Sequence, residues 1–95
     1  MSFMNKATLT GQSVSCSTTT AVSTVLAVGY NTLDNLGPAD IFIRQGGSAV
    51  VAVATTARRL PAGAETVIFV SDSNDAYVAA ITSASTATLR IHQVG

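Results

Sequence analysis

The hydrophobic positions along the chain recur with the spacing of strands rather than helices. No window places apolar residues at i, i+3, i+4 and i+7 with charged residues between them, and Thr, Val, Ser and Ala outnumber Leu, Lys and Glu. Short β-rich runs are instead bounded by clusters of Gly, Pro, Asn and Asp at intervals of about ten residues. The pattern predicts strands at Ala7 to Leu9, Ser13 to Thr18, Thr24 to Tyr30, Asp40 to Gln45, Ala49 to Ala54, Glu65 to Val70, Ala76 to Ile81 and Ala87 to Gln93.

Turn residues separate these runs. Asp34 to Pro38 is the clearest break, Gly46-Gly47 suits a tight hairpin, and Ser71 to Asp75 makes a third turn. In Leu60-Pro61-Ala62-Gly63 we expect Pro at the second turn position and Gly at the fourth. Together the signals predict an all-β fold, a small single-domain β-sandwich or jelly-roll-like barrel of about 7–8 short antiparallel strands.

The chain of 95 residues is long enough for one domain and too short for two. Residues 1–10 carry little pattern apart from Phe3 and Met4, so they are a candidate flexible arm that orders against a partner. The Ser/Thr-rich segment SVSCSTTTAVST places Val14, Cys16 and Val22 at even positions, which favours a strand or strand pair at a sheet edge.

Several predicted strands have no obvious water-facing side. The strand from Ala87 to Gln93 alternates, with Leu89 and Ile91 inward, as a half-buried strand does. By contrast, Val50 to Val53, Val67 to Val70 and Tyr77 to Ile81 offer apolar groups to both sides of a sheet. Either another protein chain covers the second side or small apolar side chains stay exposed, and we favour cover by another chain.

The composition favours self-association and argues against nucleic acid. Five basic residues balance five acidic ones, only 11% of residues are charged, and 47% are hydrophobic. A nucleic-acid binder usually carries a basic stripe with stacking rings, and neither occurs here. No apolar run approaches the roughly 20 residues of a membrane helix, so we expect no membrane partner.

The sequence offers little material for catalysis or metal binding. His92 is the only histidine and Cys16 the only cysteine, and no G-x-S-x-G elbow or phosphate-binding glycine pattern occurs. We therefore expect His92 on a solvated or interfacial strand face and Cys16 in the core, with no enzyme activity, cofactor or metal. Asp72 to Asp75 lacks the Gly and the distant Glu of a calcium loop, so an Asx-stabilised turn is the favoured interpretation.

Arg58 and Arg59 are adjacent, so an extended segment would point them to opposite faces. Either both side chains are solvated at the edge of a loop, or one of them, with Arg44 or Arg90, contacts carboxylates of another subunit. The candidate interface residues are Phe3, Arg44, Arg58, Arg59, Tyr77, Arg90 and His92.

After Tyr30 the chain reads NTLDNLGPADIFIRQGGSAVVAVATTARRLPAGAETVIFV up to Val70, and from Tyr77 to the last residue it reads YVAAITSASTATLRIHQVG. This order of segments resembles a group of small tailed-bacteriophage virion structural proteins, several of them head decoration or minor structural proteins. The LPAGA turn in its setting is the most specific part, and the first 29 residues match only in being rich in Thr, Ser and Val.

The resemblance implies a capsid decoration or cement protein that self-associates, with a trimer as the expected homo-oligomer, and docks on the major capsid protein. Such a protein would be made in the host bacterial cytoplasm, without export, and would reside on the capsid surface of the virion. The alternatives are a head-tail connector, a tail or fibre-associated module and, less favoured, a carbohydrate-binding β-sandwich. Trp is absent, so only Tyr30 and Tyr77 could stack on a sugar.

Overall fold

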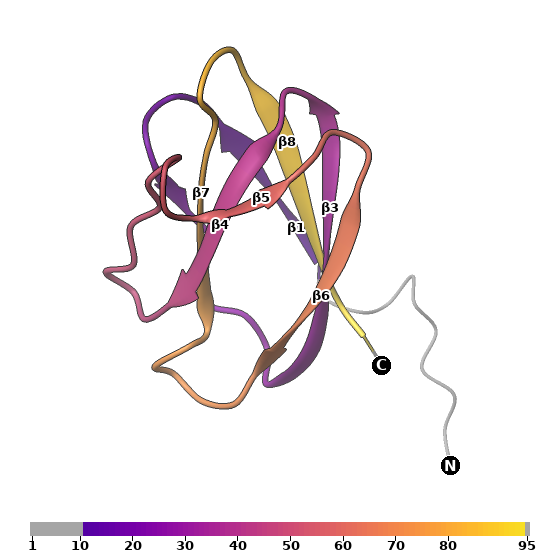
Figure 1. The fold of residues 1–95 in the computed structure, drawn as a ribbon. Helices are drawn as coiled ribbons and strands as arrows, with labels where there is room; N and C mark the ends of the chain where they lie inside the picture. The colour runs from indigo at the N-terminus through magenta and orange to yellow at the C-terminus, as the bar shows by residue number, and fades with distance from the viewer. Residues whose placement is uncertain (1–10, 95) are drawn as a thin grey trace.

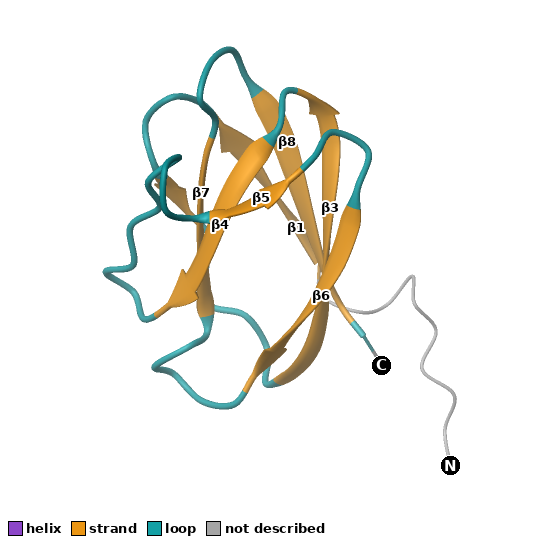
Figure 2. Ribbon diagram, in the orientation of Figure 1, coloured by secondary structure: helices purple, strands orange, loops and turns teal. Residues whose placement is uncertain are grey.

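The structure, a computed structural model, describes residues 11–94, which form strands and loops without a helix (Figure 2). No helix in this part of the chain could therefore span a membrane. The all-β prediction is confirmed. The predicted strand Ala7 to Leu9 and the N-terminal arm lie outside the described residues. The strands are β1 (Gly11–Cys16), β2 (Ala21–Val22), β3 (Gly29–Pro38), β4 (Ile41–Gly46), β5 (Arg58–Leu60), β6 (Glu65–Val70), β7 (Tyr77–Ile81) and β8 (Ala87–Gln93).

Two antiparallel four-stranded sheets face each other (Figure 1). Sheet A has the order β1-β8-β3-β6 and sheet B the order β2-β7-β4-β5. The first strand pairs with the last, the second with the seventh, the third with the sixth and the fourth with the fifth. This nested pairing is one long hairpin folded over itself, which is the arrangement of a jelly roll.

The core lies between the sheets and is filled by the inward side chains of both. In β8, Leu89 and Ile91 point inward as the alternation predicts, and in β4 so do Ile41 and Ile43. The Ser/Thr-rich segment provides β1 and β2, each at the edge of a sheet, as expected. The buried core cluster consists of Val14, Cys16, Leu26, Leu33, Ile41, Ile43, Leu60, Val70, Ala76, Val78, Ala80, Ala87, Leu89 and Ile91.

The predicted strand Ala49 to Ala54 is wrong, because this segment belongs to the loop between β4 and β5. Its backbone bonds locally, since the N–H groups of Thr56 and Ala57 both donate to the carbonyl of Val53, at 3.0 and 2.8 Å. The Gly46-Gly47 turn therefore does not lead into a tight hairpin. β-branched residues are common in strands, but here no neighbouring strand accepts the segment's ladder bonds.

The same loop covers the outer face of sheet B. Ala52 is buried and its N–H donates to Thr20 Oγ1 at 3.2 Å, at the β2 edge of the sheet. Arg58 begins β5 at the opposite edge, so the chain between Ala52 and Arg58 has to cross sheet B. Because the core fills the inner side of this sheet, the chain crosses on the outer side. Ala79 of β7 lies opposite Arg44 on the outer face and is nevertheless fully buried. This segment can be followed in Figure 1 from the end of β4 to β5.

The predicted strand Thr24 to Tyr30 is also wrong for most of its length. The segment before Gly29 makes irregular bonds instead, with the N–H groups of Ser23 and Leu26 donating to the carbonyls of Val78 and Ala76, at 2.9 and 2.8 Å. The strand in this part of the chain is β3, which starts at Gly29.

The predicted break at Asp34 to Pro38 is part of β3, which continues with a bulge between Asn35 and Pro38 and a cis peptide bond before Pro38. Asn35 is buried, and its amide donates to the carbonyls of Ala39 and Leu60, both at 2.9 Å. Asn35 Oδ1 accepts from the N–H of Gly37 at 2.7 Å. The turn-forming residues thus stabilise an irregular strand end because distant carbonyls accept the Asn35 amide.

The connection from β5 to β6 is a tight turn shifted by one residue from the expected one. The N–H of Ala64 donates to the carbonyl of Pro61 at 2.9 Å, so Gly63 occupies the third turn position. Its φ of 81° lies in the left-handed region, which a type II turn requires there and which glycine adopts at no steric cost.

Candidate interaction surface

The outer face of sheet A exposes a contiguous apolar strip. Tyr30 of β3 lies opposite Phe69 of β6, and Val67 is two residues further along β6 on the same face. The exposed fractions of Tyr30, Phe69 and Val67 are 57%, 50% and 52%. Val94 joins them beyond β8, since its N–H donates to the carbonyl of Tyr30 at 2.9 Å. We call Tyr30, Val67, Phe69 and Val94 the aromatic strip.

The two rings of the aromatic strip pack on each other. The ring centroids of Tyr30 and Phe69 are 5.0 Å apart, with an angle of 64° between the ring planes. This edge-to-face geometry is favourable for aromatic pairs, and it holds both rings in place while half of each stays exposed. The strip is therefore an ordered apolar surface.

The remainder of this face is polar. In β8, Thr88, Arg90 and His92 point outward. Arg90 lies between Ser13 of β1 and Asp34 of β3 across the sheet. The outer face of sheet A thus changes from apolar at the Phe69 end of β6 to polar toward β1, which is typical of an interaction surface with a polar rim.

The structure separates the residues that were expected to form an interface. Arg90 and His92 lie on the outer face of sheet A, as predicted for His92, whereas Arg44, Arg58 and Arg59 belong to sheet B. Tyr77 of β7 packs against the core, and Phe3 lies outside the described residues. These side chains do not form one site.

Arg59 already has a carboxylate partner in its own chain. Its Nη2 lies 2.8 Å from Asp40 Oδ2, and Asp40 Oδ1 accepts from the N–H of Ala62 at 3.1 Å. The hydrogen bond from the Ala62 N–H lowers the pKa of Asp40 most, and the hydrogen bond from Arg59 lowers it further. Arg58 lies opposite Ile43 and Arg59 opposite Phe42, so the two side chains lie on opposite faces, as predicted.

Cys16 and His92 lie on opposite sides of sheet A. Cys16 points into the core, where burial raises the pKa of its thiol, so it acts as a core side chain as expected. His92 lies on the outer face, close against Gly11. A Cβ added at Gly11 would lie only 3.1 Å from Nδ1 of His92. The sheet separates the thiol from the imidazole, so they cannot act as a nucleophile and its base.

The Asp72 to Asp75 segment is an Asx-stabilised turn, as predicted. The carboxylate of Asp75 accepts from the Ser71 N–H and hydroxyl and from the Asp72 N–H, at 2.7 to 3.2 Å. Asp72 Oδ1 accepts from the N–H of Asn74 at 2.8 Å. Within residues 11–94, no three His, Cys, Asp or Glu side chains gather where they could hold a metal ion.

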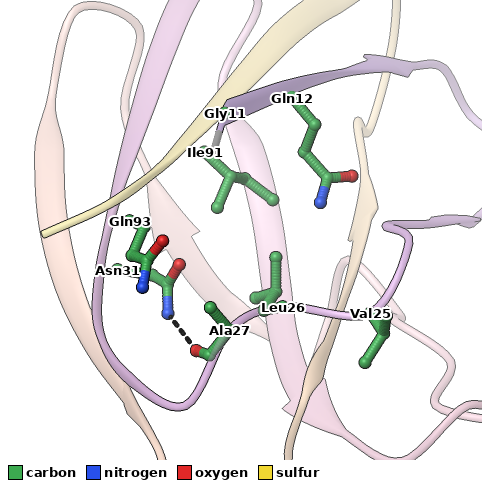
Figure 3. Close-up of a pocket in the computed structure, with 8 residues that line it drawn as sticks. All are labelled: Gly11, Gln12, Val25, Leu26, Ala27, Asn31, Ile91 and Gln93. Carbon is green, nitrogen blue, oxygen red and sulfur yellow. Dashed lines mark hydrogen bonds between the residues drawn. The ribbon is translucent and has the colours of Figure 1, made fainter. Parts of the chain in front are cut away.

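A small cavity lies at the end of the sandwich where β1 begins (Figure 3). Its volume of about 10 Å³ is close to that of one water molecule. Asn31 in its wall donates to the carbonyl of Ala27 at 3.0 Å, and Gln12 Oε1 accepts from the N–H of Thr24 at 3.0 Å. The space suits a structural water and is too small for a substrate or cofactor.

No protein-family model, curated protein or solved structure matches the chain. The resemblance to phage virion proteins thus stays an expectation from the sequence.

The aromatic strip was not among the predicted interface residues. Tyr30 and Phe69 are far apart in the sequence, and only the β3–β6 register brings their rings together. The signal available was the run Val67 to Val70, whose two-sided apolar character is real. Val67 and Phe69 point outward, while Ile68 packs against the core and Val70 lies within it.

Proposed function

We propose that this chain is a structural protein of a tailed-bacteriophage virion, a capsid decoration or cement protein that self-associates and docks on the major capsid protein. The observation that carries the proposal is the aromatic strip, an ordered apolar surface on a small domain whose core is already filled. An exposed patch of this kind, with a polar rim, is typical of a protein-binding surface.

Fold and charge support the same proposal. Jelly rolls recur in viral capsid domains, although fold alone never establishes a function. The formal net charge is zero, so copies can gather on a shell without mutual repulsion and without attraction to packaged DNA. Many weak contacts made at once would strengthen the shell through avidity.

The jelly roll also occurs in lectins, so the fold is equally compatible with the carbohydrate-binding alternative. Sugar-binding surfaces commonly offer a flat ring face, but the edge-to-face pair of Tyr30 and Phe69 presents two rings at 64°. Tyr77 packs against the core in the other sheet, so the two tyrosines do not form a joint platform. The aromatic strip therefore favours a protein partner.

The test is the composition and strength of the virion. We expect purified particles to contain the protein at a copy number on the order of hundreds, spread over the shell in a cryo-electron microscopy reconstruction. Particles made without the protein should lose DNA at a lower temperature, and adding the purified chain should restore their resistance. A single ring of copies at one vertex would favour a connector instead, and absence from the particle would refute a virion role.

Variants link the test to the aromatic strip. Tyr30→Ser should weaken binding to particles that lack the protein, because it removes one ring of the packed pair. Leu36→Ser is the matched control, since Leu36 is an equally exposed apolar residue of β3 at the far end of the strand. Equal loss of binding in both variants would contradict a role for the strip.

A further inference from the structure

β6 is the edge strand of sheet A, and its alternate residues direct their backbone groups to the open side. The N–H of Asn35 donates to the carbonyl of Ala64 and its carbonyl accepts from Gly63, so Asn35 bonds toward β6. Tyr30 bonds the other way, toward β8, through its carbonyl and Val94. Backbone direction alternates along a strand, which assigns Asn31 and Leu33, like Asn35, to the β6 side.

The register then fixes the orientation of β6. Ile68 lies opposite Asn31 and Thr66 opposite Leu33, so these residues carry the ladder to β3. Val67 and Phe69 direct their N–H and C=O groups away from the sheet. An independent contact agrees, because Gln45 Nε2 of sheet B donates to the carbonyl of Phe69 at 2.8 Å.

Gln45 closes one end of this edge. The same amide nitrogen also donates to the carbonyl of Asp75 at 2.8 Å, which anchors the side chain beside Phe69. The open part of the edge is therefore centred on Val67.

Two of the other three edges are protected in ways that β6 is not, since β5 carries Arg58 and Arg59 and β2 has only two residues. The third edge, β1, differs from β6 in exposing serines rather than apolar side chains on its outer face. Natural proteins discourage edge pairing with short strands, charged side chains, prolines and bulges. β6 pairs with β3 in unbroken register and presents Val67 and Phe69 at its centre and far end.

We propose that β6 pairs antiparallel with β6 of a second copy of this chain, around a two-fold axis at Val67, so that the two A sheets join into one. Two-fold symmetry requires the antiparallel arrangement and places each Val67 opposite its own copy. The two Val67 residues exchange both N–H···O=C bonds. Thr66 then meets Ile68 on the inner side, and both residues of this pair face the same way, as a strand pair requires.

This register also agrees with the charges and with Gln45. Glu65 lies opposite Phe69 of the second copy, so the two Glu65 carboxylates are four residues apart along the strands, roughly 13 Å. That distance exceeds the Debye length of about 8 Å at physiological salt. The Val67 pair forms without the Phe69 carbonyl, which keeps its bond to Gln45.

A second copy fits this edge better than an unrelated extended segment. The pair is self-complementary, and it brings two aromatic strips onto one face of a single continuous sheet. The doubled strip would dock as a bivalent unit. The inference rests on the self-association in the proposed function, with a two-fold dimer in place of the trimer that the resemblance implies. A monomer could still dock on the capsid if the β6 pairing failed.

The test introduces a positive or a negative charge at the two-fold axis in the full-length chain. We expect the wild type to sediment as a dimer at micromolar concentration. Val67→Lys and Val67→Glu should each dimerise at least tenfold more weakly, since each places like charges directly opposite. An equimolar mixture of the two variants should restore dimers, since the Lys side chain of one copy then faces the Glu side chain of the other.

Thr32→Lys is the matched control. Thr32 lies opposite Val67 on the same outer face but one strand inside the edge, so its substitution should leave the dimer intact. Circular dichroism spectra that match the wild type would show that each variant folds. A direct readout is hydrogen exchange of the Val67 amide, which should slow as protein concentration rises.

Three results would overturn the pairing: a monomeric wild type, dimers unaffected by either charge, or a mixture that stays monomeric. A monomeric wild type that nevertheless binds capsids through β6 would identify an extended capsid segment as the occupant instead. Presence of the protein in virions is measured separately, so failure of the dimer and failure of the proposed function give different results.

Discussion

At the scale of single residues, short polar side chains hold the irregular parts of this fold. Asn35 binds two distant carbonyls and a nearby N–H, and Asp75 gathers the donors of the β6–β7 turn. Among the described residues, no buried side-chain nitrogen or oxygen lacks a hydrogen-bond partner. Turns and bulges are thus stabilised by side chains where the ladder is interrupted.

Asp75 should make stability depend on pH. Hydrogen bonds from the Asp72 N–H and then from Ser71 lower the pKa of Asp75 below its ordinary value of 3.8. A lowered pKa in the folded state stabilises the protein fully above pH 3.8, and this contribution is lost as pH falls through the lower folded value. Urea unfolding should therefore show wild type more stable than Asp75→Asn at pH 7, with a difference that narrows below pH 3.8.

Two comparisons make the Asp75 prediction specific. Asp40 also has a lowered pKa, but it is present in both proteins, so the difference between them isolates Asp75. Calcium should not raise the unfolding midpoint, because donors within the turn already occupy the carboxylate. A gap that stays constant across the acid range, or a rise with calcium, would contradict this account.

At the scale of elements, the sequence predicted strands well where alternation or a bounding turn was strong. Glu65 to Val70 and Ala87 to Gln93 match β6 and β8 residue for residue. Ala49 to Ala54 failed because an apolar run looks the same whether it pairs in a sheet or lies on one. The aromatic strip required the register between strands distant in sequence, which local patterns do not contain.

The loop over sheet B should depend on its hydrogen bond to Thr20. Thr20→Val keeps the shape of the side chain but removes the acceptor of the Ala52 N–H, a bond worth about 1 kcal/mol, or roughly fivefold in local opening. We expect faster exchange of the Ala52 amide and faster trypsin cleavage after Arg58, at nearly unchanged global stability.

Thr19→Val is the control for the loop, since Thr19 is an exposed neighbour whose recorded hydrogen bonds use only its backbone. If both valine variants exchange and cleave at the wild-type rate, the loop is held by packing on the sheet alone.

At the scale of the whole molecule, the nested hairpin distributes both halves of the chain over both sheets. Each connection except that between β4 and β5 passes from one sheet to the other. Pairing of the strands of one sheet therefore brings the strands of the other sheet close together. One core cluster draws on both sheets, with Leu33 and Leu89 from sheet A and Ile41 and Val78 from sheet B. This topology predicts that the two sheets unfold together.

The two tyrosines allow that prediction to be measured. The chain has no tryptophan, and Tyr30 reports on sheet A while Tyr77 reports on sheet B. Fluorescence of Tyr77→Phe and of Tyr30→Phe should therefore give urea transitions that each coincide with the same variant's far-ultraviolet circular dichroism. Ile91→Val removes one buried methyl group from β8, in sheet A. Added to each tyrosine variant, it should lower the free energy of unfolding by the same amount in both, about 0.5–1.5 kcal/mol. A shift confined to the Tyr30 signal would mean that the sheets unfold independently, against a shared core.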